Sequence, residues 1–264
     1  MSEYRFMPLV HAALNRLRAP FAANPIGGRY CIICKHRVGR FLPYAGGWRA
    51  APRLMVELDC IGSDLDHFAC PRCGSHDRER HLFLYMSRTG LLEELEGRVV
   101  VHFAPERHLP GLMEAARPAR YVKCDLFPTS ADIKREDLLD MSFESDSVDL
   151  FIANHVLEHV HDDRQAVAEI CRVLRRGGRA ILQTPFSPLL HQTWQDDGIT
   201  SERARLQAFG QADHVRLYGR DFVDRIASFG LTPEVRSHED VLPDVDPVVL
   251  GVNSREPFFL FEKR

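Results

Sequence analysis

The sequence lacks the features that would place it in a membrane, an exported or a strongly nucleic-acid-binding class. No stretch of its 264 residues approaches the roughly 20 consecutive apolar residues of a membrane-spanning helix. Glu3, Arg5 and Arg16 interrupt any apolar run of the signal-peptide kind. The formal net charge is only −3, so no overall positive charge attracts nucleic acid or an anionic membrane. We therefore expect a cytoplasmic protein with no membrane partner.

Cysteine is scarce, but its placement is informative. The seven cysteines are an odd number, so we expect no disulfide framework. Four of them form two C-x2-C pairs, Cys31 with Cys34 and Cys70 with Cys73. Two such pairs can surround a tetrahedral Zn²⁺ with four thiolates, which leaves no position for water. The pattern predicts structural zinc; four reduced structural cysteines are the alternative, and Cys60, His36 and His67 are substitute ligands.

Residues 147–185 predict a strand, a helix and a second strand. Residues 148–153 form an apolar, β-branched run, as expected for a strand buried on both faces of a parallel sheet. The helix begins at Asp162 or Asp163, either of which can cap it, and its apolar residues recur at helical spacing. We expect Gly177 and Gly178 to end the helix, and residues 180–184 to form the next strand. Such a βαβ unit is typical of doubly wound α/β proteins.

Within this stretch, residues 154–160 (NHVLEHV) and 172–178 (RVLRRGG) resemble class I S-adenosylmethionine-dependent methyltransferases, in particular the type 11-like branch that acts on small molecules. The resemblance implies a doubly wound, mostly parallel sheet of seven strands, the last of them antiparallel. It divides the chain into an N-terminal helix and linker (1–30), a zinc-knuckle module with a connecting helix (31–90) and a methyltransferase domain (91–264). The third strand is expected at residues 132–135, and the last two at 233–237 and 257–262.

The turn at the end of the first strand, residues 99–104, lacks the glycines that the family has there. The family has an acidic residue and a Gly-x-Gly-x-Gly turn here, which let the backbone approach the methionine part of the cofactor. This chain has His102 at the place of the acid, Ala104 at the first glycine and Glu106 near the next. The resemblance implies that Glu106 takes over the contact with the cofactor's ammonium group.

Further cofactor residues follow the next strands. Asp125 ends the second strand, where an acid binds the ribose hydroxyls in dinucleotide folds as well. The resemblance implies that Asp137 and the backbone of Leu138 bind the adenine, with Asp140 as the alternative acid. It also places Asn154 and His155 near the sulfonium.

Acceptor binding is expected in residues 185–214, a segment too long for a simple connection and therefore predicted to be a lid. Residues 209–219 (FGQADHVRLYG) resemble the same branch. His214 is a candidate general base, because imidazole titrates near neutral pH. His191 and His155 are the other candidates.

We thus expect methyl transfer to a small-molecule acceptor, sugar-like or a secondary metabolite, most simply to oxygen. The partner would be that acceptor and not a nucleic acid, and the sequence gives no oligomeric state. One alternative is an RNA methyltransferase. It is favoured by the zinc knuckle and by the positive charge of Arg72, Arg78 and Arg80. The other is a non-catalytic binding protein, which the missing glycines permit. The N-terminal residues 5–18 predict an amphipathic helix that packs Leu14 and Leu17 on the body, or else lies on a membrane surface.

Overall fold

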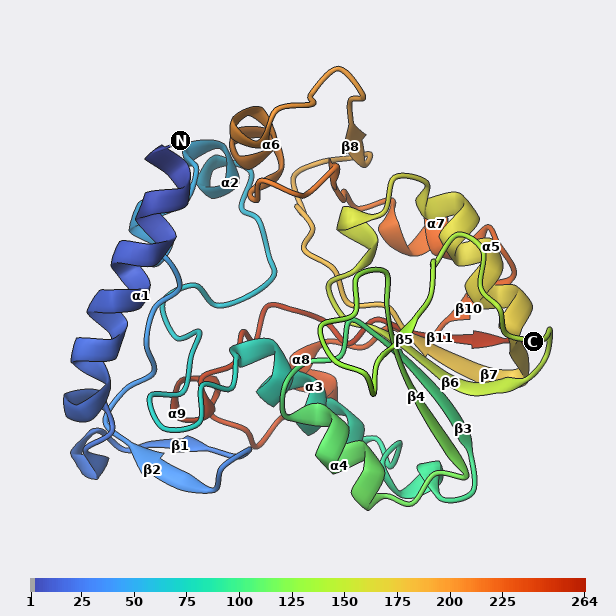
Figure 1. Ribbon diagram of the computed structural model, residues 1–264, viewed down its shortest axis with the longest axis horizontal. Helices are drawn as coiled ribbons and strands as arrows, with labels where there is room; N and C mark the ends of the chain where they lie inside the picture. Colours follow the sequence, from blue (N-terminus) through green and yellow to red (C-terminus); the bar gives the residue numbers. More distant parts are fainter. Residues whose placement is uncertain (1–2) are drawn as a thin grey trace.

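A computed structural model describes residues 3–264, and side chains from residue 11 onward. A twisted sheet with helices on both faces occupies one side of the molecule, and a long N-terminal helix and a small two-stranded sheet occupy the other (Figure 1). The sheet has seven strands in the order β10-β11-β7-β6-β3-β4-β5. This confirms the predicted doubly wound α/β fold.

The strands of this sheet are β3 (Val99–Phe103), β4 (Arg120–Asp125), β5 (Lys134–Arg135), β6 (Val148–Ala153), β7 (Leu174–Ile181), β10 (Leu231–Pro233) and β11 (Leu260–Lys263). Strands β3 to β7 are parallel, and β11 runs antiparallel between β7 and β10. The third strand is shorter than expected, and β10 and β11 begin two residues before and three residues after the predicted starts. The antiparallel last strand is as predicted.

The central βαβ unit forms, but its helix ends earlier than predicted. Helix α5 (Asp163–Val173) is capped by the Asp162 side chain, which accepts the Gln165 N–H at 3.0 Å. It ends at Val173 because Leu174 is already extended, so Gly177 and Gly178 lie within β7. Gly177, with a φ of 73°, belongs to an irregular part of the pairing between β6 and β7. The expected helix stop is therefore a distortion within a strand.

Helices cover both faces of the sheet. One face packs on α5 and α7 (Phe222–Ala227) around Phe151, Val167 and Phe259. The other packs on α3 (Asp77–Arg88) and α4 (Leu109–Ala115) around Tyr85, Leu150 and Phe258. Short helices α8 (His238–Val241) and α9 (Pro247–Leu250) follow β10. Because α3 shares its core with the sheet, packing groups it with the larger domain, and the division at residue 90 stays a prediction.

The N-terminal part is built around the cysteine pairs. Strands β1 (Arg29–Cys31) and β2 (His36–Val38) form a hairpin that lies beside α9 (Figure 1). Helix α1 (Glu3–Ala22) precedes it, and its Leu14, Leu17 and Phe21 are exposed. The expected inward packing of Leu14 and Leu17 was therefore wrong. Within the described residues, no helix is long and apolar enough to span a membrane.

Two inserted segments lie beyond the strand ends. The chain between the cysteine pairs carries α2 (Arg53–Glu57), and the predicted lid carries β8 (Trp194–Gln195) and α6 (Glu202–Phe209). The antiparallel partner of β8 is β9 (Arg216–Leu217). The two segments share an apolar cluster around Met55, Phe209 and Leu217. The predicted lid is therefore packed against the N-terminal insertion.

Candidate functional site

The four predicted zinc ligands lie together. The sulfur atoms of Cys31, Cys34, Cys70 and Cys73 are all within 4.8 Å of one another. Cys31 and Cys73 are 3.8 Å apart, and Cys34 and Cys70 are 3.9 Å apart. A tetrahedron with Zn–S bonds of ~2.3 Å has edges of about 3.8 Å, so these two distances match a zinc site. The substitute ligand His36 instead lies 2.5 Å from the Cys34 carbonyl oxygen through Nδ1.

Neighbouring groups connect this cluster to the rest of the chain. The Ser75 hydroxyl lies 3.3 Å from the sulfurs of both Cys31 and Cys73. The buried Arg80 guanidinium donates to the carbonyls of Ser75, His67 and Gly251. The zinc module is thereby joined to the loop that precedes β11. Arg80 is buried and therefore cannot contribute to an RNA-binding surface.

At the end of β3, the turn without glycines keeps a left-handed backbone. Ala104 has a φ of 45°, a conformation that glycine adopts more easily. Glu106 turns inward, with its carboxylate bonded to the Asn154 amide and 3.2 Å from His102 Nε2. Burial raises the pKa of Glu106, but the hydrogen bond and charge of His102 outweigh it and lower the pKa. His102 is fully buried and bonded to Tyr121, so it would act on a ligand only through Glu106.

The acids after β4 and β5 lie on neighbouring strand ends. The Asp125 carbonyl accepts the Glu136 N–H, which places Asp137 one residue beyond that contact. Each acid uses one oxygen to accept a backbone N–H two residues ahead, Asp125 from Phe127 and Asp137 from Leu139. Leu138 is buried, and Asp140 closes a tight turn with Asp137. Directly after Asp125, the apolar Leu126 and Phe127 are exposed.

A cavity of about 80 Å³ opens beyond the ends of β6 and β7. Its walls come from three parts of the chain: the insertion between the cysteine pairs, the strand ends and the predicted lid. They include Trp48, Met55, Cys60, Gly62, His155, Pro185, Phe209 and His214. The space admits a few non-hydrogen atoms, so it suits the reacting end of a small molecule.

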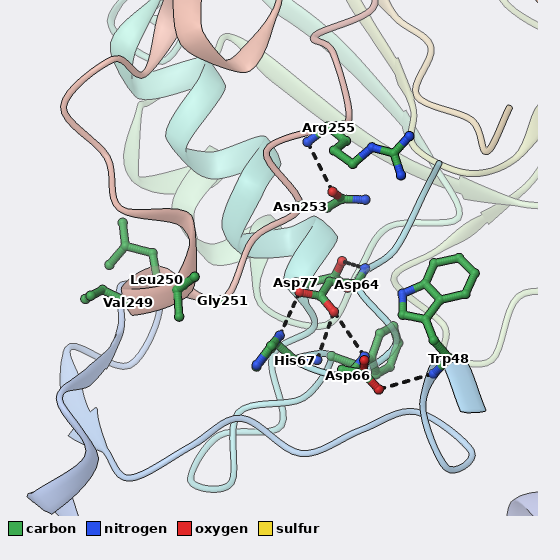
Figure 2. Close-up of polar contacts among 12 residues, drawn as sticks. Trp48, Asp64, Asp66, His67, Asp77, Val249, Leu250, Gly251, Asn253 and Arg255 are labelled. Atoms are coloured by element: carbon green, nitrogen blue, oxygen red, sulfur yellow. Dashed lines mark hydrogen bonds and ion pairs between the residues drawn. The ribbon is translucent and has the colours of Figure 1, made fainter. Parts of the chain in front are cut away.

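Polar contacts fix the wall that the insertion supplies. The backbone N–H of Trp48 donates to the Asp66 carboxylate at 3.2 Å. The backbone N–H of Asp64 donates to the buried Asp77 carboxylate of α3 at 2.5 Å (Figure 2). Asp64 also accepts from His67 Nδ1 at 2.9 Å. The predicted substitute ligand His67 is thus held by a carboxylate, as Figure 2 shows.

His155 lies between two buried carboxylates. Its Nδ1 is 3.5 Å from Glu158, and its Nε2 is 3.1 Å from Glu256. Burial lowers the pKa of His155, but the hydrogen bonds that its ring donates to these carboxylates raise it to about 9. The network continues from Glu256 to His81 and His238. His155 is therefore a cation at neutral pH and cannot accept a proton from an acceptor.

His214 differs from the other two predicted bases. Its Nδ1 donates to the Phe209 carbonyl at 2.9 Å, and its buried Nε2 has no hydrogen-bond partner among the described residues. Burial lowers its pKa, so the ring is neutral near pH 7 and Nε2 carries a lone pair. His191 is exposed, lies 3.1 Å from Arg220 and is not among the residues lining the cavity. The structure brings His155 and His214 together and leaves His191 outside.

The sequence reading gave no role to Glu158, His159 and Glu256. Glu158 and His159 lie inside the NHVLEHV match, so the motif itself was the signal that could have found them. Glu256 is separated from His155 by 101 positions, and no local pattern marks it. Trp48 and Met55 lie between the cysteine pairs, and neither was a predicted site residue.

The seven-stranded sheet with an antiparallel β11 is the one that the resemblance to class I methyltransferases implies. A family model described as a methyltransferase domain matches residues 109–182, from α4 to the end of β7. This match supports the predicted class I S-adenosylmethionine-dependent methyltransferase. No curated protein matches this chain.

Solved structures similar to this chain share little sequence with it. The YcgJ protein from Bacillus subtilis is 14% identical, with 69% of this chain and 94% of that chain covered and a TM-score of 0.44. A methyltransferase from Mesorhizobium loti is 16% identical, with 67% and 94% covered and a TM-score of 0.44. Geranyl diphosphate C-methyltransferase from Streptomyces coelicolor is 15% identical, with 67% and 77% covered and a TM-score of 0.44. These values are too low to support any conclusion on substrate.

Proposed function

We propose that the protein transfers a methyl group from S-adenosylmethionine to an oxygen of a small, sugar-like or secondary-metabolite acceptor held in the cavity beside His155 and His214. The observation that carries the proposal is one shared sheet edge. Asp125 and Asp137 lie at the ends of β4 and β5, and the cavity lies beyond β6 and β7. A donor and an acceptor bound on the two sides would meet near Asn154 and His155.

The proposed donor site uses groups that remain available at the strand ends. Asp125 would accept hydrogen bonds from the ribose hydroxyls, as acids at this position do in nucleotide-binding folds. The exposed Leu126 and Phe127 offer apolar surface to the adenine, beside the Asp137 carboxylate and the Leu138 backbone. The ionised Glu106 carboxylate, held by Asn154, would meet the ammonium group.

The proposed chemistry needs alignment more than acid–base assistance. S-adenosylmethionine supplies a methyl group that is already activated by the sulfonium. The protein would hold the acceptor oxygen in line with that methyl group, which is where most of the rate gain of such a reaction arises. Of the three predicted bases, His214 lines the cavity and has a ring nitrogen without a hydrogen-bond partner among the described residues, so the acceptor's proton would leave toward its ring.

Calorimetric titration with S-adenosylmethionine tests the donor site. We expect binding that weakens roughly 10- to 100-fold in Asp125→Ala, because a buried hydrogen bond pair is lost. The exposed lid residue Asp197 provides a matched control, and Asp197→Ala should bind as the wild type does. Absence of heat, together with no rise in Tm on adding the donor, would favour the non-catalytic alternative.

Screening of hydroxylated small molecules with radiolabelled donor tests the acceptor class. We expect label in a small molecule, and slower transfer in His214→Gln than in His191→Gln. Label recovered in RNA instead would overturn the assignment of the acceptor.

A further inference from the structure

Glu158 lies at the centre of a cluster of imidazoles, two of which, His155 and His214, line the cavity. Its Oε1 is 4.0 Å from Nε2 of His159 and 4.0 Å from Nε2 of His214. The ligand atoms of these three residues are all within 4.8 Å of one another. His155 Nδ1 approaches the same carboxylate oxygen to 3.5 Å. None of these residues belongs to the cysteine cluster, so this is a separate group with nitrogen and oxygen donors.

The outward bonds of both histidines orient their Nε2 atoms toward Glu158. His214 Nδ1 must donate to the Phe209 carbonyl at 2.9 Å, and His159 Nδ1 lies 3.3 Å from the Asp213 carboxylate. Metal-binding histidines are held in this way, with the second ring nitrogen bonded to a carbonyl or a carboxylate. The buried Nε2 lone pair of His214 thus faces the Glu158 carboxylate at 4.0 Å with no donor of its own among the described residues.

Other contacts fix the carboxylate itself. Glu158 Oε2 accepts from the Thr184 hydroxyl at 3.1 Å, and the Glu158 carbonyl accepts the Val215 N–H at 2.9 Å. Oε1 is thereby left to face the imidazoles. His214 Nε2 is a second, independent sign of a missing ligand, since it is buried and unpartnered among the described residues.

We propose that Glu158, His159 and His214 hold a divalent transition-metal cation at the wall of the acceptor cavity. Two imidazoles and one carboxylate suit Zn²⁺, Mn²⁺ or Fe²⁺. Ligand bonds of ~2.0–2.2 Å require donor atoms about 3.0–3.6 Å apart, so the cluster closes by roughly half an ångström or more on binding. The side chain of His159 is 33% exposed and has room to make that movement.

The inference rests on the proposed function and refines its acceptor. A cation with open positions facing the cavity would bind an acceptor hydroxyl, or two neighbouring hydroxyls. The bound hydroxyl loses its proton to water, the oxygen–methyl bond forms as the sulfur–methyl bond breaks, and the products are a methyl ether, S-adenosylhomocysteine and one proton. His214 then contributes as a ligand of the cation and does not itself take the proton.

Titration of the purified full chain with Mn²⁺, followed by the electron paramagnetic resonance signal of free Mn²⁺, tests the site without donor or acceptor. We expect one Mn²⁺ per chain in addition to the zinc of the cysteine cluster. His214→Gln and His159→Gln should weaken Mn²⁺ binding at least tenfold and leave the zinc content unchanged. His161→Gln changes an exposed histidine two residues beyond His159, and it should bind Mn²⁺ as the wild type does.

Failure of the wild type to bind Mn²⁺ or a second zinc at millimolar concentration would overturn the cation site, as would equal binding in His159→Gln and wild type. The partly exposed His159 makes its variant the one least at risk of misfolding. The outcomes separate the two proposals. Cation binding without binding of S-adenosylmethionine would support the cation site and remove the proposed function. Methyl transfer without cation binding would support the proposed function and remove the cation site.

Discussion

The side-chain amide of Asn253 donates to the Gly62 carbonyl at 2.7 Å, across 191 positions of the chain. This bond ties the loop before β11 to the insertion that forms one wall of the cavity. The neighbouring Arg255–Asp59 ion pair, at 2.6 and 2.8 Å, supports the same junction. The cavity is therefore closed by contacts between segments from opposite ends of the sequence.

Asn253→Ala should loosen this wall. The lost hydrogen bond lowers the free energy of unfolding by about 1 kcal/mol, because such a bond contributes roughly that much. We also expect faster amide hydrogen exchange in residues 59–65, since Gly62 loses its anchor. Gln192→Ala removes an exposed amide from the lid and serves as the control. Equal exchange in the two variants would show that the bond does not hold the insertion.

Cys70→Ser should remove zinc and unfold the module around it. A structural zinc site contributes directly to folding, so a chain with three thiolates should contain well under one zinc. Metal analysis and limited proteolysis between residues 31 and 73 measure the two effects. Cys171→Ser changes a cysteine of α5 outside the cluster and should keep about one zinc. A wild-type protein free of zinc after purification in zinc-containing medium would refute the assignment.

Arg80→Lys should destabilise the protein by about 2–4 kcal/mol. A lysine cannot reproduce the planar fork that donates to several carbonyls at once, and burial leaves those acceptors without water. Arg88 lies on the same helix but is exposed, and it pairs with Asp244 at 2.6 Å. Denaturant unfolding of Arg88→Lys should therefore differ from wild type by less than about 1 kcal/mol. Similar losses in both variants would contradict the anchoring role of Arg80.

Asp77 should make stability depend on pH. Burial raises the pKa of Asp77 to about 7, and one of its carboxylate oxygens has no hydrogen-bond partner among the described residues. The folded state thus binds this proton more tightly than the unfolded state. Its contribution to stability is present at low pH and is lost as pH rises through about 7, by up to a few kcal/mol on the order of the shift.

Asp77→Asn separates this effect from other titrations. The amide stays neutral and its oxygen can still accept the Asp64 N–H, so the variant should gain stability relative to wild type between pH 5 and pH 8. Chemical denaturation at several pH values gives the difference, and Asp197→Asn should track the wild type. Parallel pH curves for wild type and Asp77→Asn would exclude the buried-acid explanation.

The sequence by itself determined the parts of this protein that depend on local pattern. The apolar run at residues 148–153 and the cap at Asp162 predicted β6 and the start of α5, because burial on both faces and side-chain capping are local requirements. The two cysteine pairs predicted a cluster of four sulfurs, because each pair presents two sulfurs from one tight turn. The resemblance then implied a mostly parallel sheet of seven strands with an antiparallel last strand, and the acids at the strand ends.

Only the tertiary structure decided which groups face one another. It separated the three candidate histidines, giving His155 two carboxylates, His214 a free nitrogen and His191 an exposed position. It also brought Glu256 to His155 and Trp48 to the cavity. Pairing of residues about one hundred or more positions apart is set by how the sheet, the insertion and the lid pack together, and no local pattern records it. The end of α5 also escaped prediction, because pairing between β6 and β7 overrode the preference of the glycines for a helix stop.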